Sequence, residues 1–563
     1  MHDDTPNANG VDDGMTEGEI AGAATAVLVD DAAHSVGRAD WLIDNAQAYG
    51  RLLDSFRGAR RSVRIAQLAF DDDCAAYANG SLAPSPSRDA VIAERLIDLA
   101  TNAGLEIQIL LNATWILNTA RPLRKFFARR GVAPDRIQVR GMSRFPHFMH
   151  AKLVLVDERE AFLLGSPFVN SYWDSGGHAP YDARRPLREL GGRPLHDVSM
   201  HLRGPVVGDL EAMYASVWRA CGTSVFGSRV VSRREPRTSI GAARVPTQAA
   251  PASAMRVVCD APNGILPNEP DRAMNMLGEL LAGIARARSF IYIEHQYLTS
   301  RPIAAAIAAA VHRVPSLEVI IVLNQNPDLT AYRAWQNVQL EEHALLTHPR
   351  VGVFSLWSTD EDPERPGVTR INQLFIHSKV IIVDDEWAAV GTSNLDGVSM
   401  GDYGDDFAGA LGKRIFRGVR NVEVNVVIDA RDAAEPGGER DARATERRSI
   451  MELRERLWHE HLGVPRALLR QRRERGWLAT WRHAAGDNVR TLSGEDQSAI
   501  SATSGDRIAR RMVGRVLPYS VRAFPSEQLD DVGIQLDAGE LRLCYTPTWF
   551  GVHASPHWIR NIF

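Results

Sequence analysis

The 563-residue sequence lacks several features that mark whole classes of protein. No run of 18 apolar residues occurs, which argues against a transmembrane helix. The first 15 residues, MHDDTPNANGVDDGM, are acidic and polar, so no secretory signal is expected. The four cysteines show neither metal-ligand nor disulfide spacing, which fits a reducing compartment. The net charge of -4 provides no overall positive field for nucleic acid. These features predict a cytoplasmic protein, or one exported without a classical signal peptide.

Lysine is also scarce, since the chain has 61 arginines but only four lysines. Two of the four occupy the same place in a ten-residue phrase that occurs twice, as FMHAKLVLVD (148–157) and FIHSKVIIVD (375–384). The shared polar residues are His150, Lys152 and Asp157 in the first copy, and His377, Lys379 and Asp384 in the second. Arginine supplies the generic cations of this chain, so the two lysine positions are expected to need an ammonium group.

The repetition extends to the segments that precede each phrase. A helical segment leading into a strand is predicted at 51–70 and again at 277–298. A second helix and strand follow at 93–111 and 303–323, and a third strand at 136–141 and 351–357. Helices and strands that alternate at these lengths predict an α/β fold with a mixed or largely parallel sheet. We therefore expect two repeats that are related by a pseudo-twofold axis and packed into one unit.

The predicted organisation has five parts. They are a partly disordered tail (1–37), a first repeat (38–222), a linker (223–254), a second repeat (255–463) and a C-terminal region of unknown role (464–563). The linker is assigned because it is rich in Pro, Ala and Ser without periodicity. A helix is expected to end at Gly463. Segment 466–485 is rich in arginine and contains Trp477 and Trp481, which we expect to pack on the core rather than to lie on a membrane surface.

Two His-Lys pairs that face each other across one cleft would suit a phosphodiester substrate. One neutral imidazole can attack phosphorus while the opposite imidazolium protonates the leaving oxygen. The two ammonium groups can neutralise the non-bridging oxygens, so no metal or other cofactor is required. A lone histidine of this kind would more often be structural, but two matched pairs favour catalysis. Asp157 and Asp384 are left open between a structural role at the strand end and a role in tuning charge.

The chain resembles the phospholipase D superfamily, whose defining element is a duplicated HxKxxxxD motif. VGTSNLDGVSM (390–400) is similar to the family element that contacts the substrate phosphate, which implies that role for Asn394 and Thr392. IYIEHQYL (291–298) resembles another family motif, with His295 where Asn is usual. Segments 196–218 and 453–463 resemble those that close the two repeats, and the resemblance implies that Asp197 and Glu423 orient the catalytic histidines. In the first half Pro167 occupies the expected Asn position, which leaves Ser166 and Asn170 as candidates for the phosphate contact.

The resemblance implies a two-repeat α/β/α sandwich and a phospholipase D that hydrolyses the distal phosphodiester bond of glycerophospholipids. A covalent phosphohistidine, with His150 as nucleophile and His377 as general acid, would also allow transfer to alcohols. Such an enzyme would act peripherally at a membrane surface. A nuclease or other soluble phosphodiesterase is the first alternative, although the net charge does not support the basic groove it would need. A phosphatidyl-transferring lipid synthase is the second, and the lack of a transmembrane anchor disfavours it.

Overall fold

The computed structural model describes residues 37–77, 85–114, 117–186, 192–221, 254–262, 265–266, 275–328, 330–402, 414, 419–433, 440–471, 474–494, 509–521, 529–530, 534 and 541–543. The predicted tail, apart from Gly37, and the predicted linker, apart from Ala254, lie outside these residues.

Two sheets share one strand order and form the frame of the molecule. The first runs β1 (Arg38–Ile43), β9 (Val198–Arg203), β7 (Glu160–Leu163), β6 (Leu153–Val156), β2 (Ser62–Ala66), β3 (Glu106–Asn112) and β4 (Ile137–Met142). The second runs β10 (Met255–Asp260), β18 (Asn421–Asp429), β17 (Trp387–Gly391), β16 (Lys379–Val383), β11 (Phe290–His295), β12 (Glu318–Leu323) and β13 (Val351–Glu361). In each of these two runs the first four strand pairings are antiparallel and the last two are parallel. The predicted α/β fold and its duplication are confirmed.

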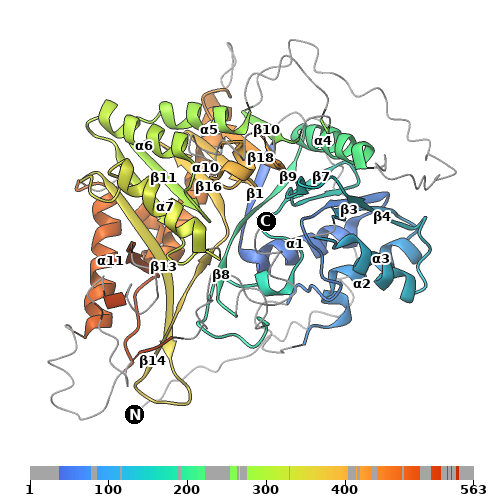
Figure 1. Ribbon diagram of the computed structural model, residues 1–563, viewed down its shortest axis with the longest axis horizontal. Helices are drawn as coiled ribbons and strands as arrows, with labels where there is room; N and C mark the ends of the chain where they lie inside the picture. The colour runs from blue at the N-terminus through green and yellow to red at the C-terminus, as the bar shows by residue number, and fades with distance from the viewer. Residues whose placement is uncertain are drawn as a thin grey trace, which may run out of the picture.

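Helices cover the sheets in the same order in both repeats. They are α1 (Asp44–Gly58), α2 (Ile92–Thr101), α3 (Ala120–Arg129) and α4 (Val206–Cys221) in the first, and α5 (Met276–Ala285), α6 (Arg301–Arg313), α7 (Thr330–Glu342) and α10 (Arg440–Leu462) in the second. Figure 1 shows α1–α3 beside the first sheet and α5–α7 beside the second, well apart from each other. Helix α10 ends one residue before Gly463, whose φ of +67° belongs to the left-handed region and ends the helix as predicted.

The aliphatic half of each repeated phrase is a strand buried on both faces. In β6, Leu153 and Leu155 belong to the core between the two sheets, whereas Val154 and Val156 belong to the outer core of the first repeat. The same alternation holds in β16. A strand with both faces covered needs apolar residues at every position, which explains why no polar residue separates the Lys from the Asp.

The first half of each phrase leaves its own sheet and pairs with the other repeat. The two-residue strand β5 (Phe148–Met149) runs parallel to the start of β18. Its counterpart β15 (Phe375–Ile376) runs parallel to β8 (Leu195–His196), just before β9. The exchange places the histidine of each repeat beside a strand of the other one. His150 and His377 therefore lie at a break between two strands rather than on one continuous strand.

The described part of the C-terminal region extends the second repeat. Helix α11 (Trp477–Ser493) packs on β12 and β13, and β19 (Val516–Pro518) pairs with β13. Strand β20 (Leu541–Leu543) pairs with β14 (Thr369–Gln373), which in turn pairs with β13. Trp477 and Trp481 are buried, as predicted. Within the described ranges, no helix combines the length and apolarity needed to cross a membrane.

Candidate active site

Two asparagine side chains hold the exchanged segments in place. The amide of Asn112, at the end of β3, donates to the carbonyl of Met149 at 2.9 Å and accepts from its N–H at 2.8 Å. Asn324, which follows β12, makes the same pair of hydrogen bonds with Ile376. The backbone just before each histidine is thereby fixed. Sequence reasoning missed both asparagines, although the endings LLN and VLN at equivalent places in the two repeats were available as a signal.

Each histidine is held by a carboxylate from the other repeat. The Nδ1 atom of His150 lies 2.8–2.9 Å from the two carboxylate oxygens of Glu423, on β18. The Nδ1 atom of His377 lies 2.9 Å from Asp197, between β8 and β9. Asp197 and Glu423 occupy the places that the sequence resemblance implied for them. Because both are fully buried, each imidazole is fixed in one orientation.

These contacts determine which ring nitrogen is free to react. An ionised carboxylate only accepts hydrogen bonds, so the Nδ1 atom of each histidine carries the hydrogen that it donates. The Nε2 atom of each neutral ring is then left with a lone pair. This is the tautomer that a nucleophile or a general base requires.

Hydroxyl groups fix the two carboxylates in turn. Thr392 donates to Glu423 at 2.6 Å, and Ser399 donates to its other oxygen at 2.8 Å. Ser166 donates to Asp197. The predicted residues Thr392 and Ser166 therefore contact the orienting carboxylates in this structure. Ser399, in α8 (Gly397–Met400), was not singled out from the sequence.

The two lysines are buried beside the histidines. The Nζ atom of Lys152 donates to the carbonyl of His150 at 2.8 Å, and Lys379 donates to the carbonyl of His377 and to Gln296 at 3.3 Å. Burial, followed by the charge of Lys379, lowers the pKa of Lys152 to about 7. Burial lowers the pKa of Lys379 to about 8 in spite of the neighbouring carboxylates. The charge of Lys379 thus acts on Lys152 of the other repeat, which indicates that the two halves form one site.

Burial and the lysines also act on the histidines. Burial lowers the pKa of His150 to about 4, with Glu423 opposing the shift and Lys152 and Lys379 adding to it. Burial and Lys379 lower the pKa of His377 to about 3. Both rings are therefore neutral at neutral pH before an anion binds. An anionic group between the lysines would offset their charge and favour protonation of one histidine.

The two aspartates of the repeated phrase lie at the far end of their strands. The carboxylate of Asp157 accepts hydrogen bonds from the backbone N–H groups of Arg60, Arg61 and Ser62, at 2.7, 2.7 and 3.0 Å. Asp384 accepts from Arg288, Ser289 and Phe290 in the same way, at 2.7–2.8 Å. Each carboxylate thus anchors the loop that leads into the neighbouring strand. These contacts are structural and place neither aspartate beside the histidines.

Asn394 is buried, and its side-chain Oδ1 atom has no hydrogen-bond partner among the described residues. The strand register identifies its counterpart, since Leu163 pairs with Leu153 as Val390 pairs with Val380. Four residues beyond these pairs, Pro167 occupies the position in the first repeat that is equivalent to Asn394 in the second, as the sequence suggested. Gly165 then matches Thr392, and a Cβ atom there would lie 1.8 Å from Asp197, so only glycine fits. Asn170, in the short helix that follows, lies beyond this position.

Two further polar residues follow or end the central strands of the sheets. His295 lies opposite Lys379 in the β11–β16 pair, and Gln67 follows β2 at the equivalent place. Both are buried, and neither Nδ1 of His295 nor the side-chain amide of Gln67 has a hydrogen-bond partner in the described part of the chain. Sequence reasoning noted His295 as a departure but did not find Gln67, which only the alignment of β2 with β11 reveals.

Comparison with known families finds a match within the second repeat. The family described as "Cardiolipin synthase, PLD-like domain" matches residues 280–436, which contain the second motif. This match supports the resemblance of the second repeat to the phospholipase D superfamily. Its first motif lies outside the matched range, but it repeats the same side chains, register and carboxylate contact.

Solved structures are similar to the chain at low identity. Phosphatidylserine synthase from Haemophilus influenzae Rd KW20 is 12% identical, covers 73% of this chain and 86% of its own, and has a TM-score of 0.46. NucT from Helicobacter pylori is 20% identical, covers 36% of this chain and 96% of its own, and has a TM-score of 0.21. Among curated proteins, none matches the sequence.

Proposed function

We propose that the chain is a phospholipase D, which cleaves the distal phosphodiester bond of glycerophospholipids through a covalent phosphohistidine. The observation that carries the proposal is the pair of buried imidazoles, each fixed through Nδ1 to a carboxylate of the other repeat. Both rings keep Nε2 available, and both have an ammonium group beside them. One nitrogen can attack phosphorus while the other serves the leaving oxygen.

The reaction then proceeds in two displacements. His150 attacks phosphorus through Nε2, the bond to the head-group oxygen breaks, and His377 donates a proton to that oxygen. Lys152 and Lys379 hold the charge that develops on the non-bridging oxygens. In the second step His377 takes a proton from water or an alcohol, whose oxygen displaces His150. The resemblance to two-motif family members supports this assignment of the two histidine roles.

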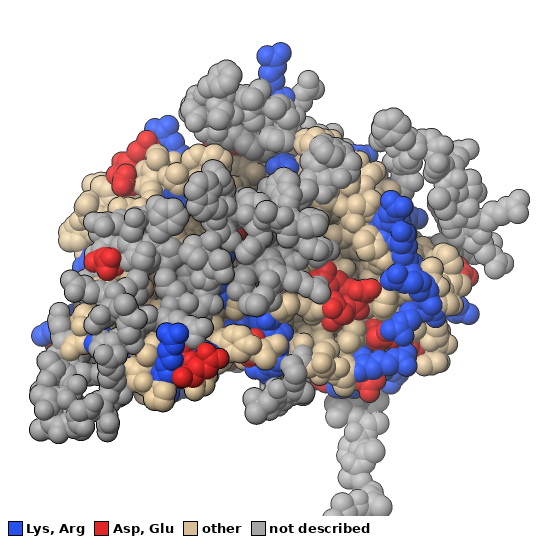
Figure 2. Space-filling view, turned by 60° about the horizontal axis from the view of Figure 1, so that its bottom comes forward, with Lys and Arg blue, Asp and Glu red and all other residues tan. Residues whose placement is uncertain are grey.

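A phosphatidyl-transferring lipid synthase is the second candidate, because the family that matches the second repeat is described by a cardiolipin synthase. The two reactions share the covalent intermediate and differ only in the acceptor that resolves it. A nuclease receives less support. The chain carries a net charge of -4, and on the face that Figure 2 presents the basic side chains form a band beside acidic ones.

Mass spectrometry of a defined lipid mixture after incubation with the protein tests the proposal. We expect phosphatidic acid in water and a phosphatidylalcohol when ethanol is added, because the intermediate can be captured by either acceptor. Cardiolipin or another diphosphatidyl product in place of phosphatidic acid would identify the synthase. Cleavage of oligonucleotides without any change in the lipids would reject both lipid reactions.

A further inference from the structure

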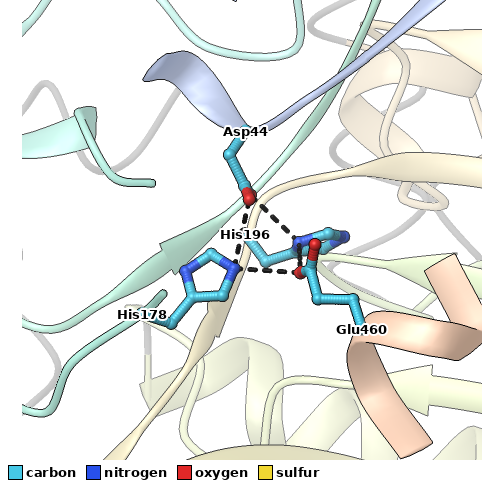
Figure 3. A group of neighbouring side chains, drawn as sticks. All are labelled: Asp44, His178, His196 and Glu460. Atoms are coloured by element: carbon cyan, nitrogen blue, oxygen red, sulfur yellow. Dashed lines mark hydrogen bonds and ion pairs between the residues drawn. The ribbon is translucent and has the colours of Figure 1, made fainter. Parts of the chain in front are cut away.

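A second cluster of titratable side chains lies outside the candidate active site. Figure 3 shows its four members pointing toward one another from different parts of the chain. We call it the clasp cluster, and it consists of Asp44 at the start of α1, His178 after the short helix at 170–172, His196 in β8 and Glu460 in α10. Three members come from the first repeat and are completely buried, whereas Glu460 comes from the second and is 15% exposed.

The four side chains direct two nitrogens and two carboxylate groups at one point. The Nε2 atom of His178 lies 3.3 Å from Asp44 Oδ2 and 3.0 Å from Glu460 Oε1. The Nδ1 atom of His196 lies 3.1 Å from Asp44 Oδ1 and 3.0 Å from the same oxygen of Glu460. Zinc bound tetrahedrally at about 2.0–2.2 Å from nitrogen and oxygen ligands would separate those ligands by about 3.3–3.5 Å. The observed separations of 3.0–3.3 Å are slightly shorter, so a small outward movement of the side chains would make room for the ion.

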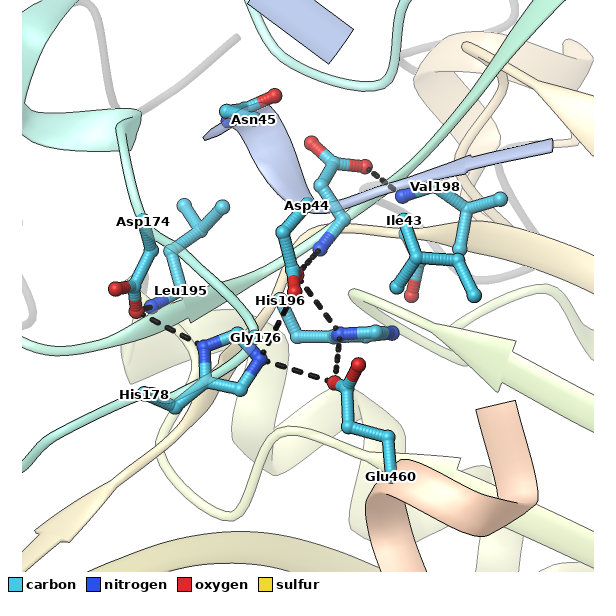
Figure 4. Close-up of polar contacts among 12 residues, drawn as sticks. Ile43, Asp44, Asn45, Asp174, Gly176, His178, Leu195, His196, Val198 and Glu460 are labelled. Carbon is cyan, nitrogen blue, oxygen red and sulfur yellow. Dashed lines mark hydrogen bonds and ion pairs between the residues drawn. The ribbon is translucent and has the colours of Figure 1, made fainter. Parts of the chain in front are cut away.

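The opposite nitrogen of each ring faces a further carboxylate. Figure 4 shows Asp174 beside His178, and the Nδ1 atom of that ring lies 3.0 Å from the carboxylate. The Nε2 atom of His196 lies 2.9 Å from Glu294. A metal-bound histidine characteristically donates its second N–H to such a carboxylate, which leaves the inward nitrogen without a hydrogen. In the clasp cluster His178 makes this outer hydrogen bond, and His196 has a carboxylate at ion-pair distance on its outer side.

Several buried atoms of the cluster are left without a hydrogen bond. Within the described ranges, both ring nitrogens of His196 and Oδ2 of Asp44 lack a hydrogen-bond partner of acceptable geometry, although their ion-pair distances are short. A buried polar atom left unpaired destabilises the folded state. Bonds to one metal ion would satisfy the two inward-facing atoms, Nδ1 of His196 and Oδ2 of Asp44, together. A divalent charge would neutralise the two carboxylates of the cluster.

Protons on both rings are the competing way to balance this charge. Burial lowers the pKa of His178, but the carboxylates of Asp44 and Asp174 outweigh burial and raise it to about 10. A proton on His196 would not give that ring well-aligned hydrogen bonds, however, because neither of its nitrogens has a hydrogen-bond partner in the described part of the chain. A metal ion tolerates the observed arrangement because it needs only the convergence of the lone pairs.

One member of the cluster borders the surface. Glu460 lines a surface pocket of about 620 Å³, together with Ile43 and Gly176. Arg456 and Arg515 line the same pocket, so a cation that approached Glu460 from this side would pass two positively charged side chains. Exchange of a bound ion with solvent is therefore expected to be slow.

We propose that the clasp cluster binds a structural divalent metal ion, and its two-nitrogen, two-oxygen ligand set favours zinc. The site has four protein ligands and no open position, which is the pattern of a structural rather than a catalytic zinc. It would join α10 of the second repeat to the first repeat next to the active site. His196 precedes Asp197 in the sequence, and Asp44 contacts Asp197, because the N–H of Asp44 donates to the carbonyl of Asp197 at 2.8 Å. The N–H of His377 donates to the carbonyl of His196 at 2.8 Å.

The proposal revises the sequence expectation of a chain without metal, but the expectation of a metal-free reaction is unaffected. It is independent of the substrate that the active site takes. Elemental analysis of the full-length protein, produced with zinc in the medium and passed over a chelating resin, tests it directly. We expect one zinc ion per chain in the wild type. Glu460→Gln and His178→Gln remove one ligand each and should lose the metal.

His201→Gln provides the matched control, because His201 is also a buried histidine paired with a carboxylate, Glu160, at 3.0 Å. This variant should retain zinc. Should the ligand variants fail to fold, the wild type alone decides: prolonged chelation should remove zinc and lower Tm, and added zinc should restore it. A folded wild-type protein without metal, a Tm that ignores both chelator and zinc, or full zinc content in folded His178→Gln would overturn the proposal.

Discussion

At the scale of single residues, the site depends on a neutral imidazole whose Nδ1 hydrogen is committed to a carboxylate. The sequence identified both histidines and both lysines from the repeated phrase, and the family resemblance identified Asp197 and Glu423. It could not identify Gln67, Asn112 or Ser399, because their importance depends on contacts between distant segments. A buried amide or hydroxyl has no distinctive spacing in the sequence.

The proposed mechanism gives the two histidines different tasks, so neither should replace the other. We expect His150→Ala and His377→Ala each to reduce kcat by about 10²–10⁴-fold or more, since general acid–base groups contribute that much. Steady-state lipid hydrolysis measures the effect. His147→Ala is the control in the same segment, because His147 is only half-buried and contacts the backbone carbonyl of Arg420. A rate above about a tenth of wild type in either active-site variant would contradict the two-histidine mechanism.

The lysines predict how the activity depends on pH. Burial lowers the pKa of Lys152 to about 7 and that of Lys379 to about 8, so both ammonium groups lose their protons as the pH rises through this range. Activity that needs their charge is present below these values and declines above them. We expect kcat/KM to fall on the alkaline side well below the ordinary lysine pKa of about 10.4.

A guanidinium group keeps its charge throughout this range. Lys152→Arg and Lys379→Arg should therefore each be slower at neutral pH, because the planar group is bulkier. Each should keep the part of the alkaline decline that belongs to the remaining lysine, and only the double variant should lose the decline altogether. A wild-type profile that stays flat up to the pKa of an ordinary lysine would show that the two charges do not limit the reaction.

At the scale of elements, the alternation of helices and strands was visible in the sequence, and the strands at 106–112 and 318–323 formed where it predicted. The break between β5 and β6 was not visible. His150 and Lys152 look like part of one strand, but the segment before His150 pairs with β18, more than 270 residues away in the sequence. Local patterns contain no information about such a partner, because any apolar pair can extend either sheet.

Asp157 of the repeated phrase stabilises the start of the neighbouring strand β2. Its carboxylate holds the turn into β2 through three backbone N–H groups, so Asp157→Ala should lower the free energy of unfolding by roughly 3 kcal/mol. Denaturant titration measures this loss. The rate per folded molecule, measured well below Tm, should stay near that of wild type. The same result is expected for Asp384→Ala, and a catalytic loss as large as that of the histidine variants would instead place the aspartates in the chemistry.

At the scale of the whole molecule, the twofold design explains why the phrase occurs twice. Each repeat supplies a His-Lys pair and the carboxylate that orients the histidine of the other repeat, so neither repeat holds a complete site. The duplication could be predicted from the sequence. The exchange of strands and the clasp cluster could not, since they join segments that no periodic pattern links.

The stereochemistry of transfer tests the central claim most directly. A phospholipid that is chiral at phosphorus can be incubated with the enzyme and ethanol, and the configuration of the phosphatidylethanol can then be determined. Two in-line displacements through a phosphohistidine each invert the configuration, so the account predicts net retention. Net inversion would show a single direct displacement by the acceptor and would contradict the covalent role of His150.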